Sequence, residues 1–411
     1  MYNKRKLIKK YLAWVFLLLF VINCYGCEKE EELVFAQPVH IEMQGVSEIS
    51  LEQEPTPEQL LEEYLATLTL EEKIGQLFYV TLGGLEQPGL ETSNQSKIVT
   101  ENALATLREY SPGGIIIMGG NVESDQQIIE LTETLQSGSK IPLFIGIDEE
   151  GGRVSRLGNA PGVTFDNVGA MQAIGDTGDP NKAYEAGTTL GSGLSAYGFN
   201  MDFAPVADVL TNPANYEIGS RSFGTDANQV AAMVTAEIQG LHEQGVGATT
   251  KHFPGHGGVI GNSHNSLQYI DTSVEDLRKT EFIPFQSAIQ ADTDAVLISH
   301  LVLTTVDSEH PSTLSAGVVT GLLRDELGYE GLVITDSFQM ASITANYSQG
   351  EAAVLTIQAG CDMILMPKEY KTCYEALLEA VRQGEISEEQ IDAACYRILQ
   401  TKIKRGILSL S

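Results

Sequence analysis

Residues 247–264 read GATTKHFPGHGGVIGNSH, and they show in one place the pattern from which the fold is predicted. Gly247–His252 is a short run of small and β-branched residues, which is typical of a buried strand. Lys251 and His252 end this run, and Pro254 with the glycines that follow excludes a regular helix there. The stretch therefore predicts a strand that delivers polar side chains to a loop.

The same unit recurs along the 411-residue chain from about residue 59. The strand-like runs are Gly75–Val80, Gly114–Met118, Leu143–Asp148, Met201–Val209, Gly247–His252, Ala295–Leu301, Leu332–Asp336 and Met363–Pro367. Helical patterns fall between them, including Gln126–Gln136, Gln229–Gln244, Val274–Gln290 and Tyr370–Gln383. This alternation predicts an α/β fold, a (β/α)8 barrel of the TIM type. A doubly wound open sheet is the alternative, although the glycine fingerprint expected after its first strand is missing.

The first 26 residues differ in composition from the rest. A basic start is followed by an apolar run from Tyr11 to Ile22, which is short for a membrane span and typical of a signal peptide. Gly26 and Cys27 follow, and a small residue before a cysteine here resembles the cleavage site of a bacterial lipoprotein. We expect a signal peptide over residues 1–26 and lipidation at Cys27, with Cys24 as the poorer fit. An uncleaved anchor or an ordinary secretory signal is the alternative.

Residues 27–58 are rich in Glu, Gln and Ser and contain three prolines, which favours an acidic, flexible tether. Residues 59–411 then form a single barrel domain. This organisation predicts export, with a lipid anchor in the outer face of the bacterial cell membrane.

The formal net charge of −30 argues against a nucleic-acid partner, because an acidic field repels phosphate backbones. Past the candidate lipidation site the cysteines are Cys361, Cys373 and Cys395. Their number is odd and none shows CxxC spacing, so we expect buried apolar side chains and no disulfide framework.

Polar residues gather at the C-terminal ends of the strand runs. They are Asp148, Lys251, His252, His300 and Asp336. In a barrel these ends converge on one face, where active sites form. The sequence therefore predicts one pocket built from distant parts of the chain.

Asp336 ends an apolar, β-branched run. A carboxylate in that position is often only the cap of the next helix. It can also attack the anomeric carbon of a sugar and form a covalent glycosyl intermediate. His264 would then protonate the leaving oxygen and later activate water, unless it is simply a polar loop residue.

A second group of residues is predicted to hold the sugar, since charged groups in a concave site make directional hydrogen bonds to hydroxyls. The group consists of Asp148, Arg156, Arg221, Lys251 and His252. For the segment around Asp148 and Arg156, a surface ion-pair loop is the simpler alternative.

A metal site is a further alternative, with His252, His256 and His264 as three ligands. The spacing of the first two mimics a helical zinc pair, but Pro254 and Gly255 lie between them and no HExxH motif is present. We expect neither a metal nor another cofactor.

These residues resemble glycoside hydrolase family 3, specifically its β-N-acetylhexosaminidase branch. The resemblance runs from about Leu60 to the C-terminus. It is carried by Leu70–Gln76, Asp148–Leu157, Ile218–Gly224, Lys251–Gly257 with the Ser-His pair beyond it, and the Asp336 segment.

The resemblance implies a single-domain retaining enzyme that removes terminal N-acetyl-β-glucosamine from cell-wall fragments or related glycans. Asp336 matches the nucleophile of the family, and His264 matches its acid/base. Its sugar-binding positions are matched by Asp148, Arg156, Arg221, Lys251 and His252.

One position departs from the family pattern, which reads Asp-Ser-His where this chain has Asn262. An amide can accept a hydrogen bond from imidazole, but it offers no negative charge to balance an imidazolium. We therefore expect slowed hydrolysis. The alternatives are a catalytically impaired, amino-sugar-binding lipoprotein, and a phosphorylase in which phosphate takes the place of water.

Overall fold

The computed structural model describes residues 55–87, 95–261 and 266–410. The predicted signal peptide, Cys27, Asn262 and His264 lie outside these residues. The helix α2 (Pro57–Thr67) begins just before the predicted start of the domain. The described residues from Pro55 onward form one compact unit.

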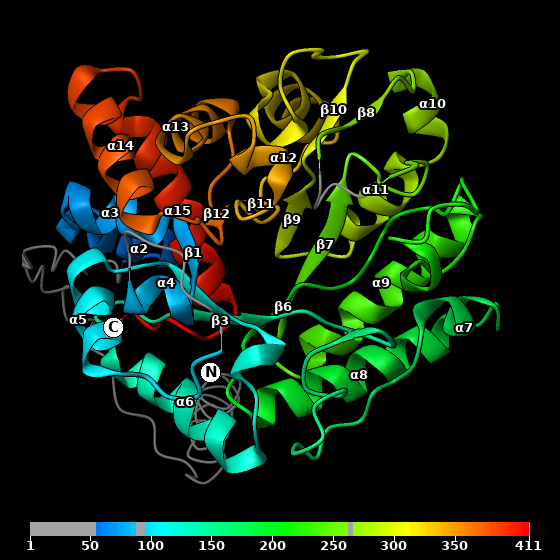
Figure 1. Ribbon diagram of the computed structural model, residues 1–411, viewed down its shortest axis with the longest axis horizontal. Helices are drawn as coiled ribbons and strands as arrows, with labels where there is room; N and C mark the ends of the chain where they lie inside the picture. Colours follow the sequence, from blue (N-terminus) through cyan, green and yellow to red (C-terminus); the bar gives the residue numbers. More distant parts are fainter. Residues whose placement is uncertain (1–54, 88–94, 262–265, 411) are drawn as a thin grey trace, which may run out of the picture. The chain divides into compact units, whose positions relative to one another are not determined.

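Eight parallel strands form the centre of this unit (Figure 1). They are β1 (Phe78–Thr81), β2 (Gly114–Ile117), β3 (Phe144–Ile147), β6 (Met201–Asp202), β7 (Gly247–Phe253), β9 (Ala295–Ile298), β11 (Leu332–Thr335) and β12 (Ile364–Leu365). Their order in the sheet is β11-β9-β7-β6-β3-β2-β1-β12. A parallel bridge between Ile334 and Met363 joins the two outer strands and closes the cylinder. The predicted TIM-type barrel is therefore confirmed.

The strands read as near-continuous apolar runs because both of their faces are buried. Large side chains fill the interior. For example, the ring centroids of Tyr79 and Phe203 lie 5.2 Å apart. Gly146 faces these rings, and a Cβ atom there would collide with the Tyr79 hydroxyl. The barrel is thus a packed core, and the room for a ligand lies at its end.

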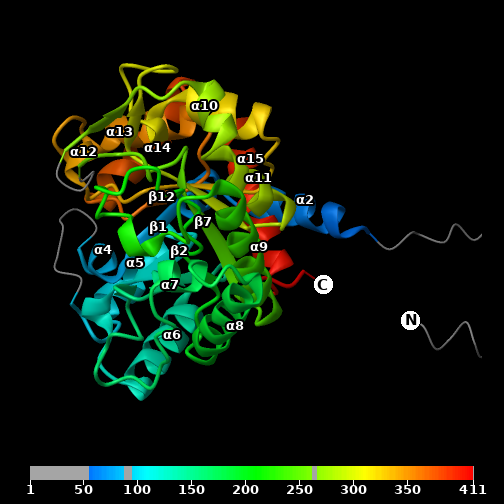
Figure 2. The same ribbon diagram turned by 90° about the vertical axis from the view of Figure 1, so that its right-hand side faces the viewer.

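Helices cover the outside of the barrel (Figures 1 and 2). They are α3 (Leu70–Gln76), α4 (Leu82–Glu86), α5 (Glu101–Tyr110), α6 (Asp125–Gly138), α7 (Met171–Gly175), α8 (Pro180–Ala196), α9 (Ala227–Glu243), α10 (Val274–Lys279), α11 (Phe282–Gln290), α12 (Ala341–Thr344), α13 (Gln349–Ala359), α14 (Tyr370–Gln383) and α15 (Glu388–Lys404). The last of them packs against α2 and α3, so both ends of the described chain meet.

The sequence marks the start of several helices. Thr69 and Glu72 form a reciprocal capping box at α3, and Ser387 and Gln390 do the same at α15. Within the described residues, no helix is both long and apolar enough to cross a membrane.

Several predicted segments differ from the structure. The run 75–80 begins within α3, so its strand starts only at Phe78, and the run 363–367 is a strand only over β12. The run 201–209 is a strand only over β6, because Pro205 lacks the N–H that a continuing ladder needs. The run 295–301 ends at Ile298, and β10 (Leu301–Leu303) pairs with β8 (Gln268–Ile270) in a separate sheet. The predicted helix 274–290 is interrupted at Thr280, whose φ of −133° and ψ of −84° are not helical.

Candidate active site

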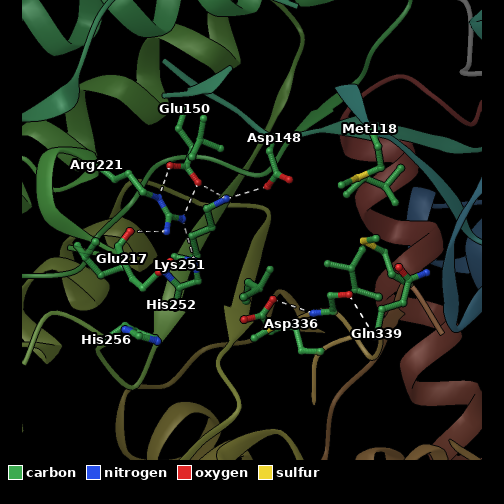
Figure 3. A pocket seen from close by; sticks show the side chains of 18 of the residues that line it. Met118, Asp148, Glu150, Glu217, Arg221, Lys251, His252, His256, Asp336 and Gln339 are labelled. Carbon is green, nitrogen blue, oxygen red and sulfur yellow. Dashed lines mark hydrogen bonds and ion pairs between the residues drawn. The ribbon is translucent and has the colours of Figure 1, made fainter. Parts of the chain in front are cut away.

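A cavity of about 420 Å³ opens at the C-terminal ends of the barrel strands (Figure 3). Its lining includes the predicted residues Asp148, Arg156, Arg221, Lys251, His252 and Asp336. It also includes residues that the sequence did not single out, among them Glu150, Glu217, Ile218, Met118 and Gln339. Side chains from separate parts of the chain therefore meet around one space.

Asp148 follows β3 and lies between two cations. Its Oδ1 accepts a hydrogen bond from Lys251 Nζ at 3.0 Å, and its Oδ2 accepts one from Arg156 Nη2 at 3.0 Å. Burial opposes ionisation of this carboxyl, but the charges of Lys251 and Arg156 outweigh it and hold the pKa of Asp148 well below its usual range. The carboxylate is therefore charged at every working pH and is a strong acceptor for sugar hydroxyls.

Glu150 forms a second charge-compensated group beside the first. Arg221 donates to it through Nε at 2.7 Å and Nη2 at 2.8 Å, and Lys251 Nζ lies 2.6 Å from Oε1. Burial raises the pKa of Glu150, but Arg221 and Lys251 outweigh burial and lower it to about 2. Lys251 thus bridges the two carboxylates and fixes their spacing.

His252 is held on both ring nitrogens. Its Nδ1 lies 2.7 Å from Asp208 Oδ2, and its Nε2 lies 3.2 Å from Arg221 Nη2. Because a guanidinium can only donate, Nε2 must be the acceptor and Nδ1 must carry the proton. The ring is therefore held in one orientation by contacts on both of its nitrogens.

The same Asp208 also fixes His256. Its Oδ1 accepts the backbone N–H of His256 at 2.6 Å. The imidazole of His256 is buried and lines the cavity, and burial lowers its pKa below the usual range. Asp208 was not predicted, although it lies at the end of a predicted strand run like the residues that were.

Asp336 lies across the cavity from the Lys251 and His252 side chains (Figure 3). It follows β11 directly, and its Oδ1 accepts the backbone N–H of Ser337 at 2.7 Å. His300 lies behind this segment and does not line the cavity. Its Nε2 donates to the Ser337 carbonyl at 3.0 Å, and its Nδ1 accepts from the Thr313 hydroxyl at 2.8 Å. His300 therefore supports the backbone beside Asp336.

Within residues 55–87, 95–261 and 266–410, no group of three or more His, Cys, Asp or Glu side chains could hold a metal ion. Cys361, Cys373 and Cys395 are free and buried, as the sequence predicts.

The chain forms a closed parallel barrel, and at the C-terminal end of the strands a carboxylate faces a group of charges that compensate one another. These features define the class of barrel enzymes whose active site lies in the loops after the strands. Within that class, the chain belongs to glycosyl hydrolase family 3: residues 69–401 match the N-terminal domain of that family.

Two curated relatives are similar over most of this chain. β-Hexosaminidase A of Pseudoalteromonas piscicida is 31% identical over 74% of this chain, and the match spans only 56% of that protein. β-Hexosaminidase LpqI of Mycobacterium tuberculosis is 33% identical over 73% of this chain and 78% of its own length. The chain therefore spans little more than half of the first relative and most of the second.

Among solved structures, a family 3 β-N-acetylglucosaminidase from Paenibacillus sp. FPU-7 is similar to this chain, with a TM-score of 0.77 and 38% identity. The match covers 84% of this chain and 65% of the Paenibacillus chain.

Proposed function

We propose that this protein is a retaining exo-β-N-acetylglucosaminidase that hydrolyses terminal N-acetyl-β-glucosamine from cell-wall fragments or related glycans. The observation that carries the proposal is Asp336, whose carboxylate faces the charged group formed by Asp148, Glu150, Arg221 and Lys251 across one cavity. The names of the relatives support the amino-sugar substrate.

In this proposal Asp336 is the nucleophile. Its carboxylate attacks the anomeric carbon while the glycosidic C–O bond breaks, and the leaving oxygen takes a proton from His264. The product of this step is a glycosyl ester of Asp336. His264 then removes a proton from water, and the water oxygen attacks the anomeric carbon. The ester bond breaks, so the Asp336 carboxylate is restored and the sugar leaves with retained anomeric configuration.

The charged residues opposite Asp336 would hold the terminal sugar. Asp148 is an acceptor for hydroxyl groups, whereas Arg156, Arg221 and Lys251 are donors. His252 presents a fixed neutral ring through its bond to Asp208. Since these groups already compensate one another, a sugar binds without meeting an unpaired buried charge.

Release of nitrophenol from an aryl N-acetyl-β-glucosaminide tests the proposal. We expect Asp336→Ala to lower the rate by at least about a thousandfold, because covalent catalysis depends on it. Asp325→Ala is the matched control, since Asp325 is an exposed acid away from the cavity. Equal rates for wild type and Asp336→Ala would refute the assignment.

Asn262 would slow the reaction, because it replaces the acid that the family pairs with the catalytic histidine. We expect Asn262→Asp to raise the turnover of the aryl substrate, within the roughly 10²–10⁴-fold that acid–base catalysis contributes. The same position favours a second candidate function, an amino-sugar-binding protein without turnover. Binding of N-acetylglucosamine with no hydrolysis by either form would support that alternative.

We also propose that the chain is made with a signal peptide over residues 1–26, that Cys27 carries the lipid, and that residues 27–58 tether a catalytic domain spanning 59–411. The basic and apolar start of the sequence supports this. Cys27→Ala should move the protein from the membrane fraction to the soluble fraction, whereas Cys24→Ala should not. Membrane association that survives Cys27→Ala would contradict the anchor.

A further inference from the structure

Glu281 is a buried acid outside the cavity, at the break between α10 and α11. Only 5% of it is exposed, and its Oε2 accepts the backbone N–H of Val209 at 3.3 Å. The interrupted helix explains how it gets there, because Thr280 leaves helical geometry just before it. The break between the helices directs Glu281 toward the catalytic end of the barrel.

The loop after β7 lies directly on this side chain. Gly255 has a φ of +124°, and a Cβ atom there would lie 2.6–2.7 Å from three carbons of Glu281. A Cβ atom at Gly257 would lie even closer to its neighbour, 1.8 Å from the Val209 carbonyl oxygen. Both glycines are therefore required for the loop to rest on Glu281 and Val209.

Glu281 is connected to the histidines of the site through Val209 and Asp208. Val209 follows Asp208, whose carboxylate accepts from His252 Nδ1 and from the His256 backbone. A displacement at Val209 or Gly255 would move the acid that orients His252 and the loop that carries His256.

Burial, and then the charge of Asp208, raises the pKa of Glu281 to about 8. Burial also opposes ionisation of Asp208, but its contact with His252 outweighs this and keeps the pKa of Asp208 low. A second cavity is lined by Glu281 together with two further ionisable groups, Tyr269 and Asp271, and His256 follows Gly255 on the loop. Lys279 on α10 is engaged with Glu275 and Asp276. The second cavity, of about 430 Å³, gives solvent a route to the carboxyl.

We propose that Glu281 in its neutral form is a positioning residue for His252 and His256, and that its ionisation displaces both from the geometry that binds the sugar. A charged Glu281 would lie beside the charged Asp208 and beneath Gly255, so the two carboxylates would repel each other. This inference rests on the proposed function, since it assigns His252 to the sugar site.

The first test compares kcat/KM for the aryl substrate at pH 7 and pH 9 in wild type and Glu281→Gln. The ratio of variant to wild type should rise about tenfold over this interval, because about nine tenths of a group with a pKa near 8 is ionised at pH 9. A ratio removes pH effects that both proteins share. A constant ratio would overturn the proposal.

Glu237→Gln is the matched control. Glu237 is a fully buried acid whose pKa burial also raises to about 8, but it lies on α9, whereas the side chain beneath Gly255 is that of Glu281. The thermal stability of both Gln variants should rise relative to that of wild type between pH 5 and pH 8. In this range a buried carboxyl with a raised pKa lowers the stability of the wild type as pH increases. Only Glu281→Gln should show the rise in the kcat/KM ratio, and the same rise in Glu237→Gln would contradict a local effect.

The imidazole NMR signals of His252 and His256 give a readout that needs no substrate. They should shift between pH 7 and 9 in wild type more than in Glu281→Gln. If the wild type hydrolysed no substrate, the proposed function would fail, and these signals would still decide the role of Glu281. Identical shifts in both proteins would overturn that role.

Discussion

At the scale of single residues, the cavity is built from charges that compensate one another. Lys251 joins Asp148 to Glu150, and each carboxylate has an arginine of its own. The low pKa values of both acids keep them ionised, so they accept hydrogen bonds and do not exchange protons. Under the proposed function these two acids are therefore sugar-binding groups and not the proton donor.

The first prediction concerns Asp148. Asp148→Asn should lower kcat/KM by about tenfold to a hundredfold, because a hydrogen bond to a charged group contributes roughly 1.5–3 kcal/mol. The change should appear mainly in KM, since this carboxylate would hold the sugar before and during the reaction alike. Steady-state kinetics on the aryl substrate measure it, with Asp325→Asn as the control. An unchanged KM would exclude a sugar contact at Asp148.

At the scale of elements, buried acids tie strands to helices. Asp294 precedes β9, is almost fully buried, and accepts the backbone N–H of Ala248 in β7 at 3.0 Å. His242 of α9 and Arg405 after α15 contact it at 2.9 and 2.7 Å. One carboxylate thus connects two strands of the barrel with the helices that cover them.

The second prediction follows from the low pKa of Asp294. Burial opposes ionisation of this carboxyl, but the hydrogen bond with His242 and the charge of Arg405 outweigh burial and keep the pKa low. Asp294→Asn should lower the free energy of unfolding at pH 7 by about 3 kcal/mol, because it leaves buried cations without a partner. A lowered pKa contributes stability above the unfolded value near 4, and this contribution is lost as pH falls below it. Denaturant unfolding at pH 7 and pH 3 measures the difference in free energy of unfolding between wild type and Asp294→Asn. This difference should be smaller at pH 3 than at pH 7, and an equal difference at both pH values would contradict the prediction.

At the scale of the whole molecule, residues from the first and last helices around the barrel meet in its interior. Lys402 of α15 is fully buried, donates to Gln76 Oε1 at 2.6 Å, and has its Nζ 5.2 Å from the centroid of the Phe144 ring. Burial lowers the pKa of Lys402 to about 7. The two residues of this hydrogen bond belong to the first and last helices of the barrel wall.

The third prediction uses this lysine. Between pH 7 and about 10.4 the unfolded chain binds a proton at Lys402 that the folded chain lacks, so wild-type stability rises with pH in that window. Methionine does not titrate. The Tm of wild type minus that of Lys402→Met should therefore increase from pH 7 to pH 10, as calorimetry can measure. A difference independent of pH would show that Lys402 is charged in the folded protein.

The sequence predicts the barrel well because eight buried runs alternate with helices, and local pattern is enough to recognise both. It predicts too much strand at 201–209, where Pro205 lacks the N–H that a ladder needs. It predicts one helix at 274–290, because the turn at Glu281 is set by Val209, which is far away in the chain. Asp148, Lys251, His252 and Asp336 could be grouped because strand ends converge.

Other features of the site depend on three-dimensional neighbours. Glu150 lies two positions after Asp148 in the sequence, and its contacts with Arg221 and Lys251 distinguish it from Glu149 as a member of the site. Asp208 becomes recognisable through His252, which lies 44 positions away. The prediction that His300 shares the pocket is wrong, because its two hydrogen bonds hold it behind the Asp336 segment.

The central claim is that Asp336 forms a covalent bond to the sugar. Incubation with a 5-fluoro glycosyl fluoride of N-acetylglucosamine, followed by proteolysis and mass spectrometry, tests it directly, because fluorine slows release of the intermediate. The account predicts a single added glycosyl group on the peptide that contains Asp336, and none on Asp336→Ala. Labelling of another carboxylate, or hydrolysis of aryl substrate with inverted configuration and no adduct, would contradict it.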